Sequence, residues 1–404
     1  MTETASAARK RAPIWVMGLT NATFGMMAGF SVVTLPQLLA ADGVPGGHIA
    51  AITATIISPG FWAFLFSPML DVRFRRRTYA IACGFLTALG AACTILHHSS
   101  PVEVEAVMTT AYIAAAFYQG AVGGWMGSLT EKGQDSILGT WFNVANVGAG
   151  GLIIVAGGPV ILHQSPIFAA AFMFVALLLP MVLFFFIPAP PPDPLLASES
   201  FGRFFRGVLA LLKRREVLIG LALFSLPSAS FTLTNVLAGI GGDYHASPNT
   251  VSFLAGAGSV IAGVGGSFLV PLFAKKIHLR PLYLTIGIVG ACFTLSTLLL
   301  PRAPWTFGLV FTGEIIFQAL AFTVANGIDF EIIGPNNPLA ATLFTLLIAA
   351  SNFPIWYMGI LDGWGYDHGG LVGSFLTDAG CSIAACLLLA ITLRKWLFVT
   401  KPSA

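Results

Sequence analysis

A few acidic side chains stand inside long apolar stretches, and these are the first residues to consider for chemistry. Glu314 lies in the stretch FTGEIIFQ, residues 311–318, with Gln318 one helical turn later on the same face. A buried carboxyl group can take up and release a proton, so Glu314 is a candidate proton carrier and Gln318 a candidate partner. The alternative is a protonated or paired Glu that only holds two helices together.

Other acidic residues are weaker candidates for the same role. Asp378 lies in LTDAG, residues 376–380, and is the second proton-coupling candidate, although it could sit near a membrane surface where water solvates it. Asp329 and Glu331 follow the apolar stretch that contains Glu314. We expect these two to be solvated or to form part of a gate.

Amide and indole side chains inside apolar stretches could bind a polar solute. Asn143 and Asn146 are three residues apart and share a helix face. Hydrogen bonding between helices explains intramembrane amides equally well, and Trp residues often only pack or mark a membrane surface. The candidates for substrate binding are Asn21, Gln119, Trp125, Asn143, Asn146, Asn235, Gln318 and Trp356, with Asn326 and Asn352 as further intramembrane amides.

Sequence patterns of common enzymes and metal sites are missing. The seven His residues are scattered, the five Cys residues lie in apolar runs without a CxxC pair, and there is no HExxH, GxSxG or P-loop motif. We therefore expect no catalytic residues, no metal and no cofactor. A membrane-embedded enzyme remains the alternative from another functional class.

Composition shows which elements must position these side chains. Of the 404 residues, 56% are hydrophobic and 9% are charged, against about 25% charged residues in soluble proteins. Apolar runs of about 20 residues favour membrane-spanning helices over the strands of a barrel. The chain is therefore expected to be an all-α polytopic membrane protein, and nucleic-acid binding, disorder and a coiled coil are excluded.

Twelve membrane spans are expected, six on each side of a long linker. The linker, residues 188–215, begins with a proline-rich run and continues as an amphipathic pattern typical of a helix in the membrane interface. We expect six-helix bundles at residues 1–187 and 216–404. The expected spans are 13–40, 46–68, 78–97, 104–128, 137–160, 165–187, 216–240, 248–273, 280–300, 304–327, 338–360 and 368–393.

Basic residues set the expected orientation. Every Lys and Arg except Arg302 falls on one side of the twelve spans, which by the positive-inside rule is the cytoplasm. Both termini are then cytoplasmic and the protein lies in the inner membrane. The first apolar run is too long for a cleavable signal peptide.

Two short similarities relate the halves of the chain. PMLDVRFRRR at residues 68–77 resembles PLFAKKIHLR at 271–280, and GTWF at 139–142 resembles ATLF at 341–344. The offsets are 203 and 202 residues, about half of the chain. This indicates a repeated six-span unit.

Six and six spans with a basic linker resemble the major facilitator superfamily of transporters. The stretch SPMLDVRFRR, residues 67–76, matches the Asp and the Arg pair of that family's GxxxDRxGRR signature. The resemblance implies a gating role for Asp71, in which it accepts hydrogen bonds from a helix of the other half, with Arg73 or Arg75 as its ion-pair partner and Arg76 and Arg77 nearby. It also implies a cavity lined by spans one, four, seven and ten, hence by Asn21, Gln119, Asn235 and Glu314.

More narrowly, the chain resembles the AmpG-like branch, the peptide–acetyl-coenzyme A transporter group. FLFSPMLD at residues 64–71 resembles FLWSPLMD, and ATLFTLL at 341–347 resembles ATxFALL. The muropeptide permeases of this branch carry acidic residues in span four, whereas YQGAVGGW at residues 118–125 has none. Siderophore importers also belong to this branch.

The function expected from this resemblance is secondary transport. The chain would move a small-to-medium polar organic solute by alternating access, in proton-coupled uptake of a muropeptide, peptide or siderophore. Its partners would be the solute, protons and the lipid bilayer, without nucleic acid, and it would be a monomer. Drug or metabolite efflux is the alternative within transport.

Overall fold

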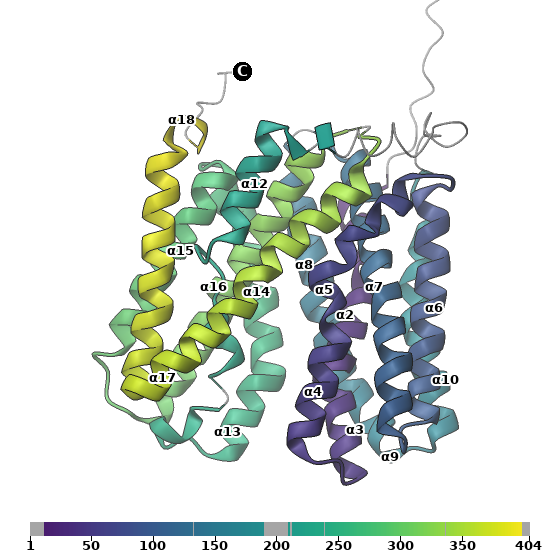
Figure 1. The fold of residues 1–404 in the computed structure, drawn as a ribbon, viewed down its shortest axis with the longest axis horizontal. Coiled ribbons are helices and arrows are strands. Elements are labelled where there is room, and N and C mark those ends of the chain that lie inside the picture. The colour runs from purple at the N-terminus through teal and green to yellow at the C-terminus, as the bar shows by residue number, and fades with distance from the viewer. Residues whose placement is uncertain are drawn as a thin grey trace, which may run out of the picture.

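The computed structural model describes residues 12–131, 133–189, 209–210, 212–237, 239–335 and 337–397. In these parts the chain is helical without any strand, and its first and second halves stand side by side (Figure 1). Nine of their helical stretches are long and apolar enough to cross a membrane. The expected all-α polytopic fold is confirmed, while most of the interfacial helix expected at residues 200–214 lies outside the described residues.

The first half forms six helical passes, several of them interrupted by π or 3-10 turns near Pro or Gly. A length of about 20 residues spans about 30 Å, which matches the apolar thickness of a bilayer. The passes are Ile14–Ala41 (α1 Ile14–Leu19, α2 Ala22–Gly29, η1 Phe30–Thr34, α3 Leu35–Ala41), Gly46–Leu65 (α4 Gly46–Ile57, α5 Pro59–Trp62, η2 Ala63–Leu65), α6 Arg76–Leu96, α7 Pro101–Leu129, Asp135–His163 (α8 Asp135–Leu152, η4 Ile153–Gly157, α9 Gly158–His163) and Pro166–Phe185 (α10 Pro166–Leu178, η5 Leu179–Phe185), with η3 Ser67–Asp71 before α6.

The second half repeats this plan less regularly. Its elements are α12 Arg215–Ser225, η7 Thr232–Asn235, η8 Gly241–Tyr244, α13 Pro248–Phe253, η9 Leu254–Gly258, α14 Ser259–Ala274, α15 Leu279–Thr297, α16 Pro304–Ile333, α17 Ala340–Thr392 and α18 Arg394–Leu397. The short α18 lies at the same end of the bundle as the start of α6, which we call the Asp71 end (Figure 1).

Span seven is broken, and the continuous helix expected at residues 216–240 is wrong. Helix α12 stops at Ser225, Leu226 is extended with ψ 152°, and Phe231 adopts a left-handed φ of 48°. Pro227 is the physical reason, because proline has no N–H to donate and forces the preceding residue out of the helical region. The unwound backbone is tied down by neighbours, since the Ser382 hydroxyl donates to the carbonyl of Ser228 at 2.9 Å.

Spans eleven and twelve form one helical hairpin. Helix α17 continues through residues 361–367, where a loop was expected, and it turns at Gly370, whose φ of 57° and ψ of −149° are not helical. A positive φ of this kind favours glycine. The two arms touch, because a Cβ on Gly373 would lie 2.1 Å from the carbonyl oxygen of Gly365.

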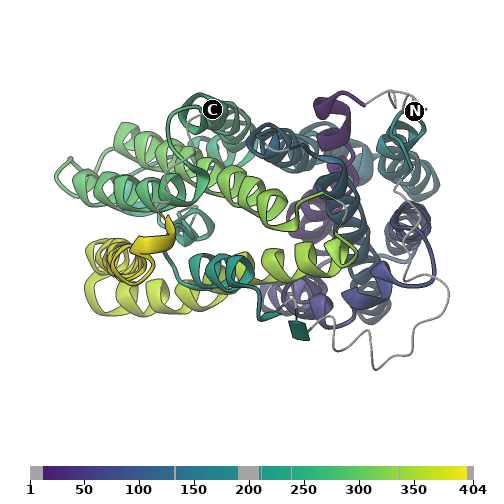
Figure 2. The same ribbon diagram turned by 90° about the horizontal axis from the view of Figure 1, so that it is seen from above.

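The halves meet along two seams made by small residues. At one seam, a Cβ on Gly139 of α8 would lie 2.6 Å from the backbone nitrogen of Gly327 in α16. At the other, a Cβ on Gly124 of α7 would lie 2.4 Å from the backbone nitrogen of Ala341 in α17. Such close approach requires residues without bulk. Seen from above, α16 and α17 reach from the second half toward the first (Figure 2). The bundle boundaries at residues 187 and 216 stay a prediction.

Candidate functional site

A polar cavity of about 180 Å³ lies where the two halves meet. It is bounded by α2 and α8 of the first half, by α7, and by α16 and α17 of the second half. Amides, aromatic rings and one carboxyl group are the characteristic side chains of its wall. The polar members are Asn21, Tyr112, Gln119, Asn143, Asn146, Asn326, Asp329, Ser351 and Asn352, and the rings are Phe24, Phe142 and Phe322.

Close helix packing brings the amides of the first half together. A Cβ on Gly25 would lie 2.3 Å from the carbonyl oxygen of Asn146, so α2 and α8 touch through their backbones. Asn21 donates to the carbonyl of Phe142 at 3.2 Å, while its own side-chain oxygen is buried without a donor from the described residues. An unsatisfied buried oxygen beside a cavity is a ready acceptor for a solute.

Asn143 links the cavity to the second half. Its amide nitrogen donates to the hydroxyl of Ser267 at 2.9 Å and lies 3.4 Å from the carbonyl oxygen of Ala319. For the side-chain amides of Gln119, Asn146 and Asn326, the described part of the protein provides no hydrogen-bond partner. These amides are therefore available to a ligand.

Asp329 is the carboxyl group of the cavity. Its side chain is fully buried, and neither oxygen receives a hydrogen bond from any described residue. The expectation that Asp329 is solvated is therefore wrong, because α16 continues to Ile333 and keeps Asp329 inside the bundle. A buried carboxyl without a donor is costly and is a strong candidate for binding a ligand or a proton.

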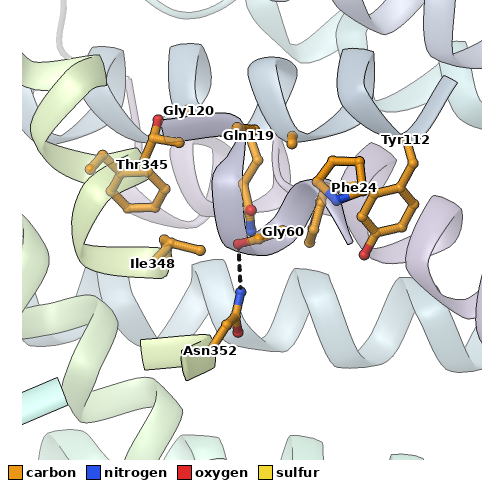
Figure 3. A pocket seen from close by; sticks show the side chains of 12 residues that line it. Phe24, Gly60, Tyr112, Gln119, Gly120, Thr345, Ile348 and Asn352 are labelled. Atoms are coloured by element: carbon orange, nitrogen blue, oxygen red, sulfur yellow. Dashed lines mark hydrogen bonds between the residues drawn. The ribbon is translucent and has the colours of Figure 1, made fainter. Parts of the chain in front are cut away.

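A smaller pocket of about 40 Å³ shares five wall residues with this cavity. Figure 3 shows Gln119 and Tyr112 on one side and Ile348 and Thr345 on the other. At its edge Asn352 donates to the carbonyl of Gly60 at 3.4 Å, which joins span eleven to span two (Figure 3). The two pockets form one polar region between the halves.

Other candidate residues lie away from this region. Asn235 is exposed in η7, and Gln318 donates to the hydroxyl of Thr234 at 2.7 Å, so that it supports the broken span seven. Trp125 is fully buried and donates to the carbonyl of Pro188 at 3.1 Å. Trp356 is 57% exposed on the outer surface of α17. None of these four residues lines the cavity.

Glu314 and Asp378 belong to a second group of acids, inside the second half. Glu314 is fully buried and its Oε1 contacts the hydroxyl of Thr294 in α15. Asp378 on α17 is buried and lies across the hairpin from Asp362, which is buried on the other arm. Sequence reasoning missed Asp362 because it lies in residues 361–367, where a loop between two spans was expected.

Asp71 caps the start of α17 across the junction of the halves. Its carboxylate accepts from the backbone N–H groups of Ala341 at 3.1 Å and Thr342 at 2.7 Å, and from the Thr342 hydroxyl at 2.7 Å. Carboxylates are stabilised at a helix N-terminus by these free N–H groups and by the helix dipole. This is the geometry that a latch between the halves requires.

The ion-pair partner of Asp71 is Arg76, and the expectation of Arg73 or Arg75 is wrong. Arg76 Nε lies 2.8 Å from Asp71 Oδ1, and Arg76 also donates to the carbonyls of Asn337 and Pro338, each at 2.8 Å. Arg73 and Arg75 are exposed, because residues 72–75 leave the helix before α6 begins. Arg77 lies over the ring of Phe185 instead.

Solved structures with the same arrangement of helices are transporters. The E. coli fucose:proton symporter FucP has a TM-score of 0.72 and 13% identity, over 93% of this chain and 98% of that one. The proton:xylose symporter XylE has a TM-score of 0.67 and 15% identity, over 95% of this chain and 96% of that one. The chain has the major facilitator fold. The human organic anion transporter TETRAN shares this fold, with a TM-score of 0.68 and 15% identity over 93% of this chain and 100% of that one.

Comparison of sequences identifies no family for the chain beyond the major facilitator fold. No protein-family model matches it, and no curated protein matches it. At 13 to 15% identity the solved structures establish the fold. Substrate and coupling must therefore be argued from the residues of the chain itself.

Proposed function

We propose that this protein is a secondary active transporter of the AmpG-like branch that takes up a polar organic solute by alternating access. The observation that carries the proposal is the amide-lined cavity between two halves that are also joined by the helix cap of Asp71. Alternating access needs a site of this kind, which the two halves can expose to either side in turn. The protein would lie in the inner membrane with both termini in the cytoplasm.

The cavity wall favours a neutral or cationic solute. Among the described residues that line it there is no Lys, Arg or His, and Asp329 is an unpaired acid. An anionic solute would find no positive charge on this wall and would be repelled whenever Asp329 is ionised, which is unfavourable in a low-dielectric site. Of the three expected substrate classes, a peptide with a free ammonium group fits best and an anionic muropeptide fits worst.

The volume of the cavity favours a small solute. About 180 Å³ is less than the roughly 300–1,000 Å³ typical of sites for drug-sized ligands, so that the cavity suits a small solute better than a siderophore. A short peptide whose ammonium group reaches Asp329 is consistent with this size. A second candidate substrate is a monosaccharide, because amides and aromatic rings suit hydroxyl groups and the similar structures include symporters for fucose and xylose.

Proton coupling is proposed for the acids of the second half. Glu314 and Asp378 are buried near the middle of their helices, where a carboxyl group could load a proton from one side and release it to the other. Glu314→Gln would then abolish uphill uptake while downhill exchange of the solute continues, because Gln resembles the permanently protonated acid.

The experiment is uptake into proteoliposomes with an imposed pH gradient. The probes are radiolabelled dialanine, a disaccharide tripeptide muropeptide, a ferric hydroxamate siderophore and D-xylose. A gradient of one pH unit can sustain about a tenfold accumulation for each coupled proton. We expect accumulation of dialanine without chemical change, and its loss in Asp329→Asn but not in the matched control Asp367→Asn, whose carboxyl group is exposed outside the cavity.

Two outcomes would contradict the proposal. Equilibration of every probe without accumulation would remove proton-coupled uptake. Accumulation of the muropeptide with none of dialanine would overturn the argument from the charge of the cavity.

A further inference from the structure

We propose that Glu314, Asp362 and Asp378 form a single proton-binding site in which Asp362 and Asp378 share one proton. The site deepens the proposed coupling and rests on it only for its role in transport. Asp362 belongs to none of the motifs of the chain. Because it lies opposite Asp378, it allows the buried acids to act as one site.

The hairpin of α17 places the two aspartates face to face. Each lies eight residues from Gly370, which is about 12 Å along its arm. Between them and the turn, the arms touch at Gly365 and Gly373 without room for a side chain. Asp362 and Asp378 stand on opposite arms just beyond this contact, at equal distances from the turn, so that the two side chains are neighbours across the hairpin.

Two buried aspartates in this arrangement require a proton. No described N–H or O–H group donates to either oxygen of Asp362, and the side chain is fully buried. Two ionised carboxylates have only acceptor atoms and repel each other, so that they can form a hydrogen bond only when one of them carries a proton. The proton therefore lies between Asp362 and Asp378.

Glu314 shows the same requirement through an independent contact. The Thr294 hydroxyl has one proton, and the carbonyl oxygen of Gly290 lies within hydrogen-bond distance of it at 3.0 Å. The same hydroxyl oxygen also contacts Oε1 of Glu314. Both contacts are satisfied when Glu314 is protonated and donates to Thr294, which donates in turn to Gly290.

Among the residues that the structure describes, no Lys, Arg or His acts on the charge of the three acids. The charged neighbours of each acid are the other acids of the group. The thiol of Cys381 lies near both aspartates. The hydroxyl of Tyr357 is the next titratable group on the same helix, acting on Cys381. The part of the chain that the structure describes offers no set of acids, His or Cys arranged to hold a metal ion. A buried carboxyl group without a neighbouring cation is neutralised by taking up a proton.

The site is connected to the cavity by one helix. Asn352 of the cavity region precedes Asp362 by ten residues of α17, about 15 Å, and Asp71 caps the start of the same helix. If the shared proton leaves, the two ionised aspartates repel each other and the two arms separate. That movement would be transmitted along α17 to the cavity and to the latch.

The test is infrared titration of the protein in lipid bilayers, without substrate. The probe is the carbonyl stretch of protonated carboxyl groups, assigned by its shift in heavy water. We expect the wild type to keep this band at neutral pH, and Asp362→Asn to lose the part that belongs to the shared proton. Asp378→Asn should lose the same part, and the double variant no more than either single variant.

Two control variants are measured by the same infrared band. Asp367→Asn, on the same helix but exposed, should leave the neutral-pH band unchanged. Asp362→Glu keeps a carboxyl group at this position and should retain the neutral-pH band. It shows whether a loss of the band in Asp362→Asn is caused by misfolding. Separate, additive losses in Asp362→Asn and Asp378→Asn would overturn the shared proton. A shared proton in a protein whose uptake ignores the pH gradient would leave this site intact and refute only the proposed coupling.

Discussion

Replacing Asp71 by Asn tests whether the contact at the start of α17 acts as a latch between the halves. The carboxylate accepts three hydrogen bonds from Ala341 and Thr342 and one from Arg76, and it is 2% exposed. Asn keeps the shape and one acceptor oxygen but turns the other acceptor into a donor. The variant therefore loses the ion pair and part of the helix cap, without creating a cavity.

The magnitude follows from the contacts that are lost. Hydrogen bonds to a charged group contribute about 1.5–3 kcal/mol each, and the interaction of a carboxylate with a helix dipole adds up to about 2 kcal/mol in partly buried geometry. Because Asn retains part of the cap, we expect a net loss of about 2–3 kcal/mol from the closed state. This shifts the equilibrium toward opening at the Asp71 end by about 30- to 150-fold.

The assay is double electron–electron resonance between nitroxide labels at positions 78 and 276, in a background without native cysteines. Thr78 on α6 and Lys276 after α14 are exposed and belong to opposite halves. We expect a longer distance population to grow in Asp71→Asn, with normal membrane insertion and slower uptake.

A matched carboxylate provides the control. Asp42 pairs with His98 at 2.5 Å inside the first half, so Asp42→Asn should leave the label distances unchanged. Identical distance distributions in the wild type and Asp71→Asn would refute the latch and leave only the role of the neighbouring arginines in orientation.

Three further predictions address the fold and the cavity. Reporter fusions at Ser100 and Asp243 should report the outside, and a cytoplasmic signal at Ser100 would refute the twelve-span topology. Gly139→Ala should lower the thermal midpoint through a loss of about 1–3 kcal/mol, because the new methyl group meets the backbone of α16, whereas Gly265→Ala on α14 has open space and should not. Asn143→Ala should weaken binding of the transported solute about three- to tenfold in a filter assay, through one lost hydrogen bond of about 1 kcal/mol, and unchanged affinity would exclude Asn143 from the site.

Apolar periodicity predicts the helical class and most spans, because the bilayer leaves few alternatives to a helix. It fails at span seven, where the apolar run passes through Pro227 and the backbone unwinds. Hydropathy registers the transfer of side chains into lipid and is insensitive to one missing hydrogen bond. The loop expected at residues 361–367 is wrong for a related reason, since polar residues there continue the helix to the turn at Gly370.

For the sites, the sequence predicts which residues are candidates but not which residues pair with each other in the folded protein. Asn21, Gln119, Asn143 and Asn146 could be selected from sequence, and the structure places them on one cavity. The arginine that pairs with Asp71 could not, because the direction of each side chain depends on where α6 begins. Nor could the proximity of Asp362 and Asp378, which depends on the hairpin that brings two helix arms together.

Uptake of radiolabelled dialanine into proteoliposomes under an imposed pH gradient tests the central claim most directly. The account predicts that the wild type accumulates the unchanged dipeptide, and that Glu314→Gln equilibrates it without accumulation. Chemical conversion of the dipeptide, or undiminished pH-driven accumulation in Glu314→Gln, would contradict the account.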